Sequence, residues 1–150
     1  MTLFHIGYEG LSFDEFLTYL KYYHISAVVD VRNSPVSRKK GFSKTVLSNN
    51  LAEQDIEYIH LQKLGTPKPL RDKLYKDHDY EEFFPAYREY LLSHTDELDS
   101  LLDIVNSMQN VLLLCYEKDP ERCHRSIVAE EAKKRNGKGL KVEPVFRTDS

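Results

Sequence analysis

An unbroken apolar run from Val111 to Cys115 is followed by a short acidic loop and then by a helical pattern. A strand made only of apolar residues is buried on both faces, which is typical of a parallel sheet covered by helices. The helical pattern opens with Cys123, His124 and Arg125. In open α/β sheets, ligands bind beyond the carboxyl ends of the strands, where helix N-termini offer N–H groups to anions. This segment therefore predicts both a fold class and the position of a site.

The rest of the chain repeats this alternation of strands and helices. Apolar and β-branched runs predict strands at 3–6, 26–32, 56–61, 111–115 and 142–146. Pro144 restricts the last strand to an edge, because proline has no N–H for a sheet ladder. The alternation predicts a three-layer α/β/α fold with a mainly parallel sheet. We expect this fold to be Rossmann-like without a dinucleotide fingerprint, because G-x-G-x-x-G is absent after the first strand. We expect one domain over residues 1–150.

Helical spacing of apolar residues predicts the intervening helices. Ser12 and Glu15 fit a capping box for the first helix, and Ser43 is a predicted cap for the second. Residues 65–69 are predicted to form a turn-rich connection. A helix is predicted over about 82–92, with Pro85 in its first turn. Its aromatic stripe, at Tyr80, Phe83, Phe84 and Tyr87, is more typical of a core face than of a base-stacking surface.

Composition restricts the class of protein. The chain has 150 residues, 41 % of them hydrophobic, and a net charge of −3, which gives no global electrostatic case for nucleic acid. No apolar run approaches the roughly 18 residues that span a membrane, and no signal-peptide pattern is present. We therefore expect a cytoplasmic protein that does not enter membranes. Two cysteines do not make a disulfide framework, so free thiols are expected.

Cys115 is a candidate nucleophile. A thiol at a strand end that faces a helix N-terminus and arginines has a lowered pKa, which favours nucleophilic chemistry. The order of strand, cysteine, loop, arginine and helix resembles rhodanese-like sulfurtransferases and cysteine-dependent phosphatases. The loop departs from the phosphatase pattern, because six residues separate Cys115 from Arg122 and three of them are acidic: Glu117, Asp119 and Glu121. The alternative is a buried cysteine that packs as a small hydrophobic residue.

The Cys123-His124-Arg125 segment offers different chemistry. Arg125 is suited to binding a phosphate or carboxylate through two hydrogen bonds, and His124 to acid–base work near neutral pH. Helix packing is the alternative role for Cys123 and His124. Cys-x7-Cys-His is a poor zinc signature, because a further ligand must come from elsewhere, so no metal or other cofactor is expected.

Two earlier segments also place polar residues at strand ends. Asp30 and Arg32 lie on the same side of their strand, so they either face the cleft or form a buried ion pair. Tyr8 lies where the first strand–helix loop touches a ligand in such folds, although a plain turn is an equal alternative. Basic residues cluster at 38–40, where a local patch can bind phosphate, and at 133–135, where a solvated helix face is expected.

Together these motifs resemble a family known as domain of unknown function 488. The resemblance rests on motifs in order along nearly the whole chain: His5-Ile-Gly-Tyr8, Val29-Asp-Val-Arg32, Pro35, Ser37-Arg38, Phe42, Ile56-Glu-Tyr58, Leu64-Gly65, Leu114-Cys-Tyr-Glu117 and Cys123-His-Arg125. It implies a small intracellular α/β domain and supplies no reaction. It directs attention to the polar residues at the strand ends, which should converge on one cleft.

The sequence thus favours an enzyme that acts on an anionic substrate related to nucleotides or nucleic acids. The expected catalytic residues are Glu117, His124, Asp30, Cys123 and Cys115. The expected substrate-binding residues are Arg32, Arg38, Arg125, Tyr8 and Ser37. One alternative is a nucleic-acid or nucleotide binding module without catalysis. A second alternative is rhodanese- or phosphatase-like cysteine chemistry.

Overall fold

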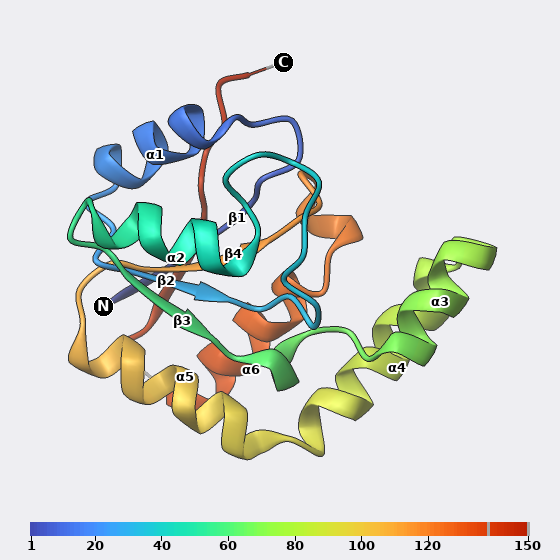
Figure 1. Cartoon of the computed structure of the whole chain (residues 1–150). Coiled ribbons are helices and arrows are strands. Elements are labelled where there is room, and N and C mark those ends of the chain that lie inside the picture. Colours follow the sequence, from blue (N-terminus) through green and yellow to red (C-terminus); the bar gives the residue numbers. More distant parts are fainter. Residues whose placement is uncertain (138, 150) are drawn as a thin grey trace.

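Five parallel strands form one sheet in the computed structural model, which describes residues 1–137 and 139–149 (Figure 1). The strands are β1 (Thr2–Gly7), β2 (Ala27–Asp30), β3 (Glu57–His60), β4 (Val111–Cys115) and β5 (Lys141–Pro144). Their order across the sheet is β3-β2-β4-β1-β5. Strand β4 lies between β2 and β1 and is buried along its whole length, as its unbroken apolar sequence predicts.

Helices cover both faces of the sheet. One face carries α1 (Phe13–Tyr22) and α2 (Lys44–Ala52), and the other carries α5 (Thr95–Ser107) and α6 (Arg125–Asn136). Two further helices, α3 (Lys68–Asp77) and α4 (Tyr80–Leu92), extend to one side of the sheet (Figure 1). Alternate residues of the strands point into two separate cores, and the predicted three-layer α/β/α fold is confirmed.

Several local predictions are also confirmed. The side chain of Ser12 accepts from the Glu15 N–H, and Glu15 accepts from the Ser12 N–H, which completes the capping box of α1. Strand β5 is an edge strand, and Pro144 lies at its end. The aromatic stripe on α4 packs into the core, with Tyr87 fully buried. Among the residues described, no helix combines the length and apolar character that crossing a membrane requires.

Three local predictions are wrong. The connection after residue 65 contains α3, which was not predicted because it buries none of its residues and so has no strong apolar period. Helix α4 begins at Tyr80 rather than near 82, which places Pro85 beyond the first turn. Ser43 stands at the N-cap of α2 but does not cap it, because its hydroxyl bonds the backbone of Ser37.

The strand order brings three loops together at one edge of the sheet. The chain leaves β1, β2 and β4 at neighbouring positions, because β4 lies between the other two. Backbone hydrogen bonds continue between the strands where the loops begin. The Val31 N–H donates to Leu114 O over 3.1 Å, and the Tyr8 N–H donates to Cys115 O over 3.0 Å. In open α/β sheets this edge is where ligands bind. The fold therefore places the residues after β1, β2 and β4 around one point.

Gly7 allows the loop after β4 to approach the end of β1. A Cβ atom at Gly7 would overlap the backbone carbonyl of Glu117. Because the clash is with backbone rather than with a flexible side chain, the loop would have to move. Gly7 therefore helps to fix the position of Glu117.

Replacing Gly7 with Ala should lower the free energy of unfolding by about 3 kcal/mol, because the added methyl group displaces the Glu117 backbone. Gly137→Ala is the control: a Cβ there meets nothing within 4 Å, and only its φ of +78° is unfavourable, at about 1–2 kcal/mol. Urea unfolding of both variants measures the difference. If both variants lost the same free energy of unfolding, the contact between Gly7 and the Glu117 backbone would add nothing to the stability of the fold.

Candidate functional site

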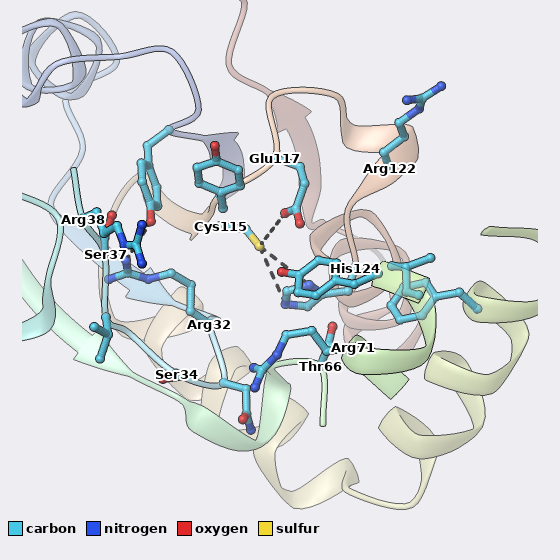
Figure 2. A pocket seen from close by; sticks show the side chains of 17 residues that line it. Arg32, Ser34, Ser37, Arg38, Thr66, Arg71, Cys115, Glu117, Arg122 and His124 are labelled. Carbon is cyan, nitrogen blue, oxygen red and sulfur yellow. Dashed lines mark hydrogen bonds between the residues drawn. The ribbon is translucent and has the colours of Figure 1, made fainter. Parts of the chain in front are cut away.

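A cavity of about 280 Å³ opens at the carboxyl ends of β1, β2 and β4 (Figure 2). Its wall comes from the loops after these strands and from α3 and α4. Its lining residues are Tyr8, Arg32, Asn33, Ser34, Val36, Ser37, Arg38, Thr66, Arg71, Leu74, Tyr75, Phe83, Cys115, Tyr116, Glu117, Arg122 and His124. Four arginines in this set make it a basic cavity for a chain whose net charge is −3.

Arg32 is neutralised by a buried partner. Its Nη2 lies 2.7 Å from Asp30 Oδ2 and its Nε lies 2.8 Å from Asp30 Oδ1, so the contact is bidentate. The Tyr58 hydroxyl also donates to Asp30, which is wholly buried. Burial alone would lower the pKa of Arg32, but Asp30 and the Tyr8 hydroxyl outweigh burial and raise it. Arg32 thus stays charged and is held rigidly at the cavity wall.

Arg38 and Arg71 differ from Arg32 because their charges are not neutralised by neighbours. Across residues 1–137 and 139–149, neither guanidinium has a protein acceptor within hydrogen-bonding distance, and both line the cavity. Arg122 also lines it, but its guanidinium points outward and lies 3.9 Å from Asp119 (Figure 2). We call Arg38 and Arg71 the free arginines. Free guanidinium groups beside a cavity are suited to binding phosphate or carboxylate.

Cys115, Glu117 and His124 form the floor of the cavity. The Cys115 thiol lies 3.5 Å from Glu117 Oε2 and 3.6 Å from His124 Nδ1 (Figure 2). His124 Nε2 lies 2.7 Å from Val31 O. Because a backbone carbonyl only accepts, Nε2 carries a hydrogen and Nδ1 of a neutral ring is left with its lone pair. The imidazole also packs edge-on against the Tyr87 ring, 5.2 Å between centroids.

Burial shifts the pKa of each group on the floor. It raises the pKa of Glu117 to about 7, and Cys123 acts in the same direction. Burial and the neighbouring Cys123 also raise the pKa of Cys115. For Cys123 itself, burial is outweighed by hydrogen bonds from Cys115 and His124, which lower its pKa. For His124, burial is outweighed by the contact with Cys123, which raises its pKa. Such a group of shifted residues in a cleft is typical of a functional site.

Arg125 lies behind the floor and does not line the cavity. Its side chain is only 2 % exposed. Nε donates to His5 Nδ1 over 3.1 Å, Nη2 donates to Lys118 O over 3.1 Å, and Nη1 donates to Glu117 O. The predicted role of Arg125 in binding substrate thus has no support in this arrangement, because its donors already have acceptors within the protein. Arg125 instead fixes the backbone on either side of Glu117.

Aromatic rings complete the cavity. Tyr8 stacks on Phe42 with 4.3 Å between centroids, and Arg32 lies over the Tyr8 ring at 5.3 Å. Tyr8 is buried by these contacts. Tyr75 and Tyr116 also line the cavity and are 64 % and 45 % exposed. Their free faces are available to stack on a planar ligand.

The structure brings most of the predicted site residues together. Those that line the cavity are Tyr8, Arg32, Ser37, Arg38, Cys115, Glu117 and His124. Asp30, Cys123 and Arg125 are buried behind them and touch the cavity only through the residues that they position.

Sequence reasoning missed the contribution of α3. Arg71 and Tyr75 lie on one face of this helix, four residues apart, and both reach the cavity. Two signals were available: prolines at the helix start, Pro67 and Pro69, and the pair Leu70 and Leu74 at helical spacing. The position of α3 beside the cavity depends on tertiary packing, which a local pattern does not give.

The fold and the site define an α/β domain with a basic cavity at the carboxyl edge of an all-parallel sheet. The family model described as "Domain of unknown function DUF488" matches residues 12–132 of this chain. The chain therefore belongs to this family, as its motifs predict. No curated protein and no solved structure matches the chain.

The contact between His5 and Arg125 predicts a dependence of stability on pH. Burial, with Arg125 acting in the same direction, lowers the pKa of His5 to about 4. The unfolded chain then binds a proton at His5 more tightly than the folded protein does. The free energy of unfolding should therefore fall as the pH drops from about 6.5 to 4.

Replacing His5 with Gln should reduce this acid-dependent loss, because Gln keeps an acceptor for Arg125 and does not titrate. Urea unfolding at several pH values between 4 and 7 measures the slope. The control is His78→Gln, at an exposed position outside the cavity, which should leave the slope unchanged. If the free energy of unfolding of the His5 variant still fell with pH as steeply as that of the unmodified protein, His5 would not be the source of the pH dependence.

Proposed function

We propose that this protein is an enzyme that acts on a small phosphate-bearing substrate of the nucleotide class. The observation that carries this proposal is the position of the free arginines, Arg38 and Arg71, beside a cavity whose floor holds buried Cys115 and His124 and half-buried Glu117. A buried cluster of titratable groups within reach of an anion site is more typical of an active site than of a binding surface.

The size and lining of the cavity favour a small ligand over a polynucleotide. Its volume of about 280 Å³ is at the lower end of the range for small-molecule sites. Arg38 and Arg71 would bind the phosphate, and the exposed rings of Tyr75 and Tyr116 offer stacking surfaces for a planar base. Arg32, already paired with Asp30, would shape the wall of the cavity from a fixed position.

The groups on the floor have distinct roles in this proposal. The Glu117 carboxylate faces the cavity and is the candidate to accept or donate a proton at the substrate. His124 is held by its hydrogen bond to Val31 O and orients the Cys115 thiol. Asp30 and Arg125 act from behind the site, as positioning residues for Arg32 and Glu117.

Cysteine chemistry of the rhodanese or phosphatase type has less support. A phosphatase-like loop needs free backbone N–H groups that surround the anion. Here the Lys118 and Glu121 amides donate to carboxylates, of Glu9 at 3.0 Å and of Asp119 at 2.9 Å. Burial also raises the pKa of Cys115, which disfavours the reactive thiolate.

Replacing Arg38 or Arg71 with Gln should weaken the binding of a nucleoside monophosphate by about tenfold to a hundredfold, since a charge-assisted hydrogen bond is lost. Isothermal titration calorimetry with the common ribonucleoside 5′-monophosphates measures this. Lys40→Gln is the matched control: it removes a charge from the same loop as Arg38 but outside the cavity. If Lys40→Gln weakened nucleotide binding as much as Arg38→Gln, the result would contradict a specific anion site.

Replacing Glu117 with Gln should lower turnover of a bound nucleotide by about 10²–10⁴-fold, because the amide does not transfer a proton. The Kd of the ligand should change little. Chromatography of the nucleotide after incubation measures turnover, and Glu121→Gln serves as a control on the same loop, outside the cavity. A nucleotide that binds tightly and is recovered unchanged from the unmodified protein would instead favour a binding module without catalysis.

A further inference from the structure

Three potential metal ligands meet at the floor of the cavity. The donor atoms of Cys115, Cys123 and His124 all lie within 4.8 Å of one another, and all three residues are buried. In tetrahedral zinc sites, zinc–sulfur bonds of about 2.3 Å and zinc–nitrogen bonds of about 2.0 Å place sulfur and nitrogen about 3.5 Å apart. The Cys115 thiol and His124 Nδ1 lie 3.6 Å apart. This sulfur–nitrogen separation agrees with that of a zinc site, and the three donors are close enough together to share one ion.

The histidine is also oriented as a metal ligand requires. Its Nε2 is bonded to Val31 O over 2.7 Å, which leaves Nδ1 to face the cysteines. Histidines that bind metals usually donate their other N–H to a backbone carbonyl or a carboxylate in this way. The sulfur of Cys115 lies 3.9 Å from Nε2 as well. The sulfur thus lies beside the ring rather than along the Nδ1 lone pair, and binding of a metal at Nδ1 would require the Cys115 side chain to turn.

The three ligands lie at the ends of regular elements. Cys115 is the last residue of β4, and Cys123 and His124 directly precede the first residue of α6. Neither cysteine is in a disulfide.

The cavity lies on the open side of the cluster. Cys115 and His124 line it, whereas Cys123 lies behind them. Glu117 is close to the Cys115 thiol but does not belong to the group of three donors. A metal at this point would have three protein ligands and one coordination position that faces the cavity, as catalytic zinc sites do.

We propose that Cys115, Cys123 and His124 bind one zinc ion, with the fourth position open to the cavity beside Glu117. Two thiolates and one imidazole favour zinc over harder cations such as magnesium or calcium. Each thiol that is protonated beforehand releases its proton to solvent as the metal–sulfur bond forms. The zinc site goes beyond the proposed function. Zinc binding is measured without any substrate, so its test does not depend on whether the protein acts on a nucleotide.

Metal analysis of the whole chain, purified with a reductant and without chelators, tests the proposal. We expect one zinc per chain, with a Kd of about 1 nM or lower in competition with a chromophoric chelator. Replacement of zinc by Co²⁺ should give a thiolate-to-cobalt charge-transfer band and the visible bands of tetrahedral cobalt. This measurement needs no variant. Absence of a stoichiometric metal, or octahedral cobalt without thiolate ligands, would overturn the site.

Variants identify the ligands. Cys123→Ser and His124→Gln should each weaken zinc binding by about 100-fold or more, since even the loss of an outer partner costs about 10–100-fold. His60→Gln is the matched control, because His60 lies at the same edge of the sheet and bonds Arg32 O. The affinity of the His60→Gln protein for zinc should equal that of the unmodified protein. Circular dichroism establishes that each variant is folded.

Glu117→Gln tests the open position. It should keep one zinc with an affinity within about tenfold of the unmodified protein, because Glu117 lies beside the metal and is not a ligand. A loss as large as that of His124→Gln would overturn the open position and make Glu117 the fourth ligand. Loss of both free thiols on mild oxidation, with no metal bound under reducing conditions, would identify a disulfide-forming pair in place of a metal site.

Discussion

The buried guanidinium of Arg125 is the interaction on which the candidate site depends. It joins three parts of the fold: the first turn of α6, His5 in β1, and the backbone carbonyls of Glu117 and Lys118 after β4. A buried charge without partners costs several kcal/mol, so these contacts hold the loop in one arrangement. Gly7 permits the same loop to lie against β1. The direction of the Glu117 side chain is therefore set by residues that do not face the cavity.

The arginines of this protein divide into two groups with different physical roles. Arg125 and Arg32 are buried, and their donors are satisfied by carbonyls or by Asp30. Arg38 and Arg71 line the cavity without such partners among the residues described. Because an arginine that already has a carboxylate gains little from a second anion, the second group is better suited to bind a ligand. The first group gives the cavity its shape, and the second gives it an unsatisfied positive charge.

The sequence predicted the fold better than the site, for a physical reason. The strands and the helices α1, α2, α4, α5 and α6 each bury an apolar face, so local periodicity indicates them. Helix α3 buries no residue and was missed, and with it Arg71 and Tyr75. Arg125 was expected to bind an anion because it lies at a helix start. A guanidinium donates to a phosphate or to a backbone carbonyl, so the residue type alone does not distinguish the two partners.

The two proposals are connected through the sign of the charge at the floor of the cavity. Without a metal, an ionised Glu117 would repel an anion from the floor, while Arg38 and Arg71 would attract it to the wall. A phosphate would then bind beside the arginines, with the uncharged part of the ligand toward Cys115. A zinc ion would reverse this preference, because a divalent cation would attract an oxygen of the ligand to the floor. Under the two proposals, the metal-bound or metal-free state of Cys115, Cys123 and His124 would decide which end of a nucleotide lies next to Glu117.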